Sequence, residues 1–416
     1  MSPTGPRRRL LYLLPFPPRP DGAHGASKMT GQLLEQLVDS HEVGALYLRA
    51  QSEPPIDGPL RDRLALAEEI TRPGPPVSAS GRASLLMRRG LGFIAGRPAW
   101  ATDWAVPEFA RRAREVALSW RPDVVQAELH VMGQYLPALT GLGSLRILVD
   151  HEPGAAASAD LEAWERGPRR VGRHLDGLAW RRYERRVLAA TDAVVTFSEE
   201  DRRVLVARAP GARVFRISPG VALPSQPFDP IGAEPPRVLF VGSFVHPPNV
   251  DGAIRLASDI FPQVSARHPG ARLEIVGDAP PAAVRDLAGA GVVVTGRVDD
   301  VRPYLDRAAV VAAPLRLGRG TRVKVLESLA AGKALVATPR ALAGVDVVAG
   351  EHVLVASSDA EIRDALLALL DAPDRRRRLA GAARAWAVEN LRWDDTVAAY
   401  DSLYDSLVTT QGGDVP

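Results

Sequence analysis

Short apolar runs separated by longer amphipathic stretches recur along the whole 416-residue chain, and this alternation constrains the fold most. Short apolar runs are typical of buried strands, and the stretches between them are long enough to form helices. Parallel strands need such crossover connections, so the pattern predicts repeated βα units around parallel sheets, an α/β fold. The predicted strands are 10–14, 43–48, 124–126, 146–149, 193–197, 238–241, 273–276, 292–295, 310–313, 335–337 and 353–355, and the predicted helices of the first half are 27–40, 107–120 and 175–190.

A proline cluster at 223–236 interrupts this alternation. Proline lacks a backbone N–H and continues neither helix nor sheet, so we interpret the cluster as a linker. It separates two predicted Rossmann-like, doubly wound domains, 1–222 and 237–395, which we expect to face a central cleft. Residues 396–416 begin with aromatic and apolar residues at helical spacing. They predict a C-terminal helix and tail that cross back to the first domain.

Composition excludes several classes of protein. The chain has no cysteine, so it has no disulfide, thiolate nucleophile or cysteine-ligated metal. Its eight histidines form no HExxH motif, and we predict no metal site. A net charge of +3 argues against a nucleic-acid partner. No apolar run reaches the roughly 18 residues of a membrane span. The apolar run after Arg9 ends at Pro15, so we interpret it as a strand and not as a signal peptide. We therefore expect a cytoplasmic protein.

Residues 50–104 follow no clear pattern. Prolines interrupt helix formation there, while large apolar residues and arginines are interleaved. Two interpretations stay open. The stretch is either an insertion packed on the first sheet, or a surface that receives an amphiphilic acceptor or contacts an anionic membrane.

The most informative stretch is 314–333, where a strand is followed by glycines and a helix predicted from near Thr321 to Gly332. A glycine turn that leads into a helix N-terminus presents free N–H groups to a phosphate. Lysine occurs only at Lys28, Lys324 and Lys333. Lys324 and Glu327 share a helix face, which allows a simple surface ion pair. Alternatively, Arg322 and Lys324 hold a diphosphate while the two oxygens of Glu327 accept the vicinal hydroxyls of a ribose.

Short motifs follow one another along both halves of the chain. Those of the second half are Phe-Val-Gly-Ser at 240–243, Pro-Asn-Val-Asp-Gly at 248–252, Ile-Val-Gly-Asp at 275–278, Thr-Gly-Arg-Val at 295–298 and Lys-Val-Leu-Glu-Ser-Leu-Ala-Ala-Gly-Lys at 324–333. Those of the first half are Pro-Phe-Pro-Pro at 15–18, Asp-Gly-Ala-His-Gly at 21–25, Tyr-Glu at 183–184, Asp-Ala-Val-Val-Thr-Phe-Ser-Glu at 192–199 and Ile-Ser-Pro-Gly-Val at 217–221. With these motifs the second half resembles the donor domain of the GT-B glycosyltransferases of family 4, and the first half is similar more loosely.

The resemblance implies that the first domain binds the acceptor and the second binds the donor. Glu327 matches the second glutamate of the family's paired-glutamate motif, the glutamate that binds the ribose. Arg319 occupies the position of the motif's first glutamate. The family's diphosphate-binding cations near Gly242 and Gly252 are missing, because Ser243 follows Gly242, and Asn249 or Val250 stands near Gly252. Arg322 and Lys324 are expected to replace them. The implied donor site comprises Gly22, Gly25, Gly242, Ser243, Gly277, Arg297, Val298, Gly318, Arg319, Gly320, Thr321 and Glu327.

The function implied is retaining, metal-independent transfer from a nucleotide-diphosphate sugar, the co-substrate, to a hydroxyl acceptor, with no other cofactor. His151, just beyond a predicted strand, matches the family's histidine at the donor sugar, and His24 is assigned to the acceptor. The expected partners are the sugar donor and the hydroxyl acceptor, together with peripheral contact to a membrane surface. The alternatives are a sugar-nucleotide epimerase, a phosphorylase, or a non-catalytic partner subunit of the same fold. A dehydrogenase is disfavoured because no GxGxxG follows a first strand.

Overall fold

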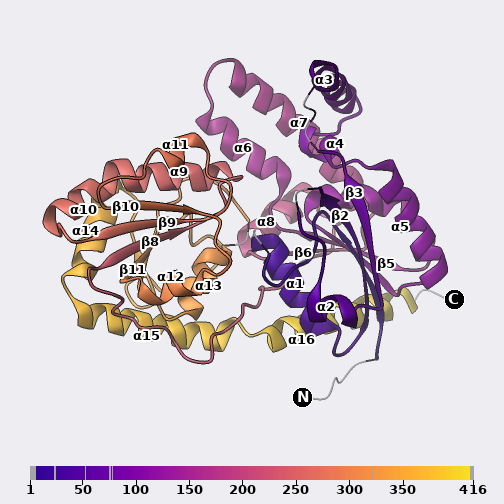
Figure 1. Ribbon diagram of the computed structural model, residues 1–416. Helices are drawn as coiled ribbons and strands as arrows, with labels where there is room; N and C mark the ends of the chain where they lie inside the picture. The colour runs from indigo at the N-terminus through magenta and orange to yellow at the C-terminus, as the bar shows by residue number, and fades with distance from the viewer. Residues whose placement is uncertain are drawn as a thin grey trace. The chain divides into compact units, whose positions relative to one another are not determined.

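The computed structural model describes residues 6–22, 25–51, 53–74, 76, 78–320 and 322–412. Its contacts divide the chain into two compact units (Figure 1). Unit 1 contains the residues up to 20, residues 30–218 and the residues from 396 onward, and unit 2 contains 21–29 and 219–395. Among the helices of the described residues, none is both long and apolar enough to cross a membrane.

Unit 1 is built on a parallel sheet of seven strands in the order β3-β2-β1-β4-β5-β6-β7. The strands are β1 (Arg9–Leu14), β2 (Glu42–Ala50), β3 (Leu66–Arg72), β4 (Val124–Glu128), β5 (Leu145–Asp150), β6 (Ala193–Thr196) and β7 (Val214–Arg216). The helices are α1 (Gly25–Leu37, which starts within unit 2), α2 (Gly58–Arg63), α3 (Ala79–Ile94), α4 (Ala99–Asp103), α5 (Pro107–Trp120), the 3₁₀ helix η1 (His130–Leu139), α6 (Gly154–Trp164), α7 (Pro168–Ala189) and α8 (Glu199–Arg208).

Unit 2 is built on six parallel strands in the order β10-β9-β8-β11-β12-β13, a doubly wound order. The strands are β8 (Arg237–Val241), β9 (Arg272–Val276), β10 (Val292–Gly296), β11 (Val310–Ala313), β12 (Leu335–Ala337) and β13 (Leu354–Val355). The helices are α9 (Pro247–Arg255), the π-helical η2 (Leu256–Ile260), α10 (Phe261–Arg267), α11 (Ala282–Arg285), α12 (Arg302–Arg307), α13 (Val323–Ala330), α14 (Asp359–Leu370) and α15 (Pro373–Asn390). Helices α9, α10 and α14 lie on one face of this sheet, and α13 and α15 lie on the other (Figure 1).

Both sheets are covered on their two faces, so their central strands read as continuous apolar runs. In unit 1, alternate residues of β1 point to opposite faces. Leu11 and Leu13 join a core that includes Phe109 of α5. On the opposite face, Tyr12 meets Tyr404 of α16 (Trp393–Gly412). The hydroxyl of Tyr404 also donates to the Gln126 side chain of β4 at 3.0 Å. The predicted C-terminal helix therefore packs on unit 1 from residue 396 onward.

The predicted strands are all present, but two strands of unit 1 were not predicted. β3 is an edge strand with the sequence Leu-Ala-Glu-Glu-Ile-Thr-Arg, and it is only partly buried, so it shows no apolar run. β7 has only three residues, none of them fully buried. The stretch 50–104 is thus resolved into strand β3 and helices α2, α3 and α4. The predicted linker packs along unit 2, where the N–H of Phe228 donates to Ala331 O at 2.9 Å.

Candidate functional site

The loops after β8 and β9 bring their glycine backbones together at the carboxyl end of the unit 2 sheet. The N–H of Gly242 donates to Val276 O at 2.9 Å, and the N–H of Gly277 donates to Gly296 O at 3.2 Å. A Cβ on Gly277 would lie 1.9 Å from the carbonyl oxygen of Gly242, so no larger residue fits there. Glycine thus lets the backbones of these two loops pack closely together, with Gly242 buried and Gly277 partly buried.

The loop after β11 leads into α13 through a glycine turn, as the sequence predicts. Gly318 and Gly320 have φ of +91° and +85°, a conformation that glycine adopts at little cost. Arg322 is buried, and its guanidinium donates to Gly318 O at 2.7 Å and to Arg319 O at 3.2 Å. Arg322 therefore braces the turn, and its predicted contact with a diphosphate stays a prediction. Thr321 lies outside the described residues.

Helix α13 ends where the sequence predicts, since Gly332 adopts a φ of +69° directly after the cap residue Ala331. Its first turn carries no acidic residue. The N-terminal end of a helix carries a partial positive charge, so acids there stabilise a helix, and α13 lacks them.

Lys324 extends from the first turn of α13 to the loop after β8. Its Nζ donates to Asn249 Oδ1 at 2.6 Å and lies 4.6 Å from the ring centroid of Phe240. A Cβ built on Gly242 would lie 2.9 Å from this Nζ. Among the described residues no carboxylate pairs with the ammonium, and burial, followed by the charge of Arg322, lowers the pKa of Lys324 to about 7. The structure thus places a cation in the loop of Gly242, Ser243 and Asn249. In this loop the sequence lacks the diphosphate-binding cations that the family resemblance leads us to expect.

Glu327 pairs with Lys28, not with Lys324. The predicted alternative of a Lys324–Glu327 surface ion pair is therefore wrong. The side chain of Glu327 is 19% exposed and that of Lys28 is 32% exposed. Lys28 belongs to the segment 21–29, which packs in unit 2. Gly25 of the same segment lies against Val323, whose Cγ2 would be 2.9 Å from an added Cβ.

Several predicted site residues have less informative surroundings. Gly22 lies in the 21–29 segment, and His24, the predicted acceptor residue, lies outside the described residues. Arg297 is exposed just after β10, and Val298 is partly buried against the core of unit 2. The roles predicted for these residues stay predictions.

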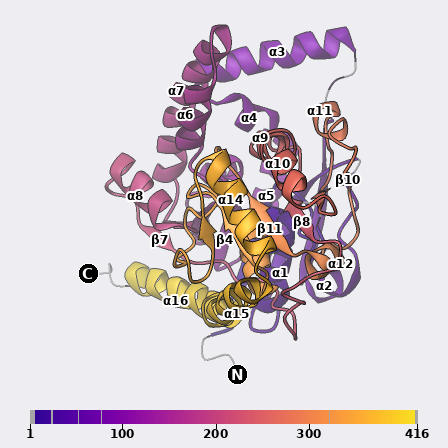
Figure 2. The same ribbon diagram turned by 90° about the vertical axis from the view of Figure 1, so that its left-hand side faces the viewer.

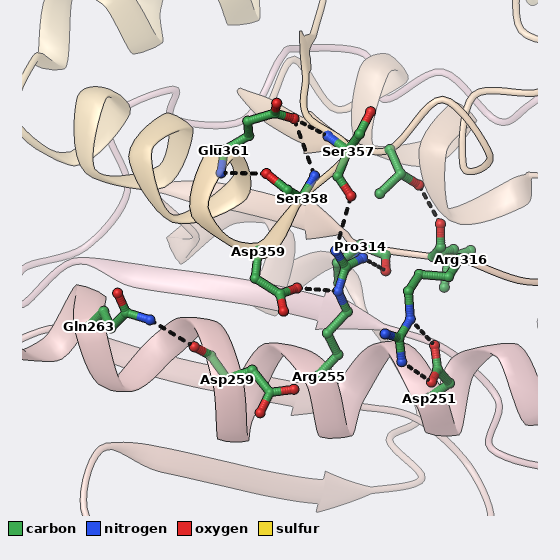
Figure 3. Close-up of polar contacts among 12 residues, drawn as sticks. Asp251, Arg255, Asp259, Gln263, Pro314, Arg316, Ser357, Ser358, Asp359 and Glu361 are labelled. Carbon is green, nitrogen blue, oxygen red and sulfur yellow. Dashed lines mark hydrogen bonds and ion pairs between the residues drawn. The ribbon is translucent and has the colours of Figure 1, made fainter.

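A polar network holds the start of the glycine loop (Figure 3). The buried guanidinium of Arg255, from α9, donates to Pro314 O at 3.0 Å and to Ser357 O at 3.1 Å, and it pairs with Asp359 at the start of α14. Arg316, in the loop, donates to both carboxylate oxygens of Asp251 at 3.1 and 2.6 Å. The network ties the start of the loop, at Pro314 and Arg316, to α9 and α14.

Unit 1 carries a second polar cluster, at the carboxyl ends of β4 and β5. His151 is buried, and its Nε2 lies 2.9 Å from Glu128 Oε2. The histidine is thus held by Glu128, which is 23 residues away in the sequence. Nearby, His130 Nδ1 lies 3.5 Å from Asp150 Oδ1. Burial lowers the pKa of His130, but Asp150, with the charges of Glu152 and Glu184, raises it, and the net shift is upward.

Sequence reasoning missed Lys28, Glu128, Asp251 and Arg255. Only Lys28 carried a signal, because lysine is rare in this chain. Arg255 is one of many arginines, and its partners are distant in sequence. Across the described ranges, no three His, Asp or Glu side chains gather where they could hold a metal ion.

Comparisons with known proteins agree with this architecture. Residues 235–372 match the sequence model of the family described as glycosyl transferases group 1. A comparison with curated proteins found no match. Among solved structures, sucrose-phosphate synthase from Thermosynechococcus elongatus aligns with a TM-score of 0.72 and 17% identity over 97% of this chain and 100% of that one.

Two further structures are similar over nearly their whole length. HepE from Anabaena, in complex with UDP and glucose, aligns with a TM-score of 0.65 and 13% identity over 96% of this chain and 100% of that one. WaaG, a glycosyltransferase involved in lipopolysaccharide biosynthesis, aligns with a TM-score of 0.64 and 15% identity over 94% of this chain and 98% of that one. The architecture of two parallel sheets is the GT-B fold, as predicted.

Proposed function

We propose that this chain, a glycosyltransferase by its group 1 domain and its GT-B fold, moves a sugar from a nucleotide-diphosphate sugar to a hydroxyl acceptor with retention of configuration. The observation that carries the proposal is Lys324. Its ammonium has no carboxylate partner among the described residues, and it lies where a Cβ on Gly242 would be only 2.9 Å away. Holding a partly buried cation without a counter-ion is unfavourable until an anion binds it.

A diphosphate fits this position. Its oxygens would accept hydrogen bonds from Lys324 and from the N–H groups at the start of α13, where the helix dipole adds to the attraction. Glu327 lies one turn further along the same helix, so a ribose attached to the diphosphate would reach it. Lys28 holds Oε1 of Glu327, and Oε2 is left to accept ribose hydroxyls.

These groups would act on the leaving group rather than on the acceptor. As the bond to the sugar breaks, negative charge develops on the departing diphosphate, and Lys324 and the helix N-terminus would stabilise it. The same phosphate oxygens would take the acceptor proton on the face from which the diphosphate leaves, which accounts for retention. His151, oriented by Glu128, is proposed to contact the donor sugar.

Sugar transfer is tested by incubating the protein with a panel of nucleotide sugars and hydroxyl acceptors. UDP-sugars come first, because HepE binds UDP and glucose. We expect a glycoside product whose anomeric configuration, read by NMR, matches that of the donor. Conversion of the nucleotide sugar without an acceptor would favour the epimerase. Binding of nucleoside diphosphates without turnover of any donor would favour the non-catalytic subunit.

The pKa of Lys324 predicts how nucleotide affinity depends on pH. In the free protein this pKa is about 7, and a bound diphosphate raises it, so binding above pH 7 takes up a proton. The Kd for UDP is expected to rise by up to about tenfold per pH unit above pH 7. Calorimetry in buffers of different ionisation enthalpy measures both the affinity and the proton uptake.

The matched control is Lys324→Arg, which stays charged throughout this range and should show a Kd independent of pH. Phosphate oxygens with a pKa near 6 are already ionised above pH 7, so they do not produce the effect. A wild-type Kd that is constant between pH 7 and 9 would contradict the assignment.

A further inference from the structure

Helix α3 of unit 1 exposes its large apolar side chains. Leu86, Met87, Leu91 and Ile94 are between 60% and 86% exposed. Met87, Leu91 and Ile94 recur at spacings of four and three residues, so they form one stripe along the helix. A helix on a protein surface normally turns such a stripe toward the core. Exposed apolar patches of this kind mark sites of interaction.

The opposite face of α3 is fixed to the protein. Arg89 pairs with Asp103 of α4, with Nε 3.0 Å from Oδ1. Gly92 lies so close to Thr102 that an added Cβ would be 2.4 Å from its Oγ1. Residues 89 and 92 are three apart, on the side of the helix away from the Met87–Leu91–Ile94 stripe. The packing of α3 therefore holds its apolar stripe outward.

The exposed charged side chains that α3 itself carries are all positive, and Asp103 of α4 neutralises Arg89 on the opposite face. Helix α3 contains Arg82, Arg88 and Arg89 and no acidic residue, and Arg88 and the following Arg97 are exposed. Helix α7, beside α3 in Figures 1 and 2, repeats the pattern, with exposed Val171, Leu175 and Leu178 at spacings of four and three. Its own exposed charged residues are arginines and a histidine, because its two acids, Asp176 and Glu184, are partly or fully buried. Glu162 and Glu165 lie within ion-pair distance of Arg170, Arg173 and His174 at its start, so the cations further along α7 are the ones available to an anionic surface.

We propose that α3, together with the exposed stripe of α7, forms an interfacial surface that binds an anionic lipid bilayer. The apolar stripe would enter the boundary of the acyl chains, while the arginines contact the lipid phosphates. A second copy of the chain is a poorer occupant, since it would bring two acid-free, arginine-bearing helices against each other. This inference is independent of the proposed sugar transfer.

The test is co-sedimentation of the full-length protein with vesicles of phosphatidylcholine alone or with added phosphatidylglycerol. We expect binding to the anionic vesicles only. The triple variant Met87→Ser, Leu91→Ser, Ile94→Ser should lower the bound fraction at least about tenfold, and Arg88→Glu with Arg97→Glu should abolish the response to phosphatidylglycerol. The matched control is Val388→Ser with Val408→Ser, which removes exposed apolar side chains from α15 and α16 and should not change binding.

Folding of each variant is checked by its Tm and by UDP binding, which depends on unit 2. Equal sedimentation with neutral and anionic vesicles, or unchanged sedimentation of the triple variant, would overturn the proposal. The proposal would also be overturned if the wild-type protein is a dimer and the triple variant is a monomer, because a second copy of the chain would then cover the stripe. If the wild-type protein does not bind UDP, that result counts against the proposed function and not against this surface.

Discussion

Replacing Lys324 by alanine is expected to lower the affinity for UDP by about 100-fold while leaving the fold intact. The ammonium supplies charge-assisted hydrogen bonds to the diphosphate from a site of low polarity, where each is strong. Its removal costs the free protein little, because the side chain of Lys324 donates to a neutral partner, Asn249 Oδ1, and carries an unfavourable charge. Isothermal titration calorimetry measures the loss of affinity.

Calorimetric unfolding separates this effect from misfolding. The folded-state pKa of Lys324, about 7, lies below its ordinary value of 10.5, so the unfolded chain binds more protons between these pH values. This lysine therefore makes the free energy of unfolding rise with pH across that window, and the alanine variant should lack this contribution. Asn249→Asp is a second control, because a carboxylate beside the retained lysine would also weaken UDP binding. Near-normal turnover in Lys324→Ala would contradict the proposed site.

Replacing Glu327 by alanine is expected to lower kcat/KM for the donor by about 100-fold and to remove the preference for ribose over 2′-deoxyribose. The wild-type protein should bind UDP at least about tenfold more tightly than 2′-deoxy-UDP, because the missing hydroxyl leaves the carboxylate oxygen without its partner. Comparing both nucleotides with both proteins isolates the contact between Glu327 and the 2′-hydroxyl.

Lys28→Ala is the matched control for this experiment. It removes the partner of Glu327 but keeps the carboxylate, so the preference for ribose should be weakened and still measurable. Glu327→Gln keeps one acceptor oxygen and should give an intermediate preference. If Glu327→Ala still prefers UDP to 2′-deoxy-UDP by the wild-type factor, the ribose is bound elsewhere.

The sequence predicts the central strands of both units because they are buried on two faces and read as continuous apolar runs. It does not predict β3, which lies at the edge of its sheet, is partly exposed and carries the two glutamates Glu68 and Glu69. Nor does it predict that the proline-rich stretch 223–236 packs along unit 2. Local patterns report local burial, whereas edge strands and packed loops depend on tertiary contacts.

The same limit applies to the candidate site. The glycine turn and the end of α13 at Gly332 both follow from the local sequence. The partner of Glu327 does not, because Lys28 is about 300 residues away in the chain. The spacing of Lys324 and Glu327 allows an ion pair, but the neighbouring Asn249 and Phe240 attract the ammonium away from the helix face. The support of the loop by Arg255 depends equally on distant partners.

A crystal structure with bound UDP tests the central claim most directly. We expect the diphosphate within hydrogen-bonding distance of Lys324 Nζ and the N-terminus of α13, and the ribose hydroxyls on Glu327, with Lys28 still in contact. UDP bound away from α13, or a ribose that does not reach Glu327, would contradict the assignment of unit 2 as the donor-binding unit.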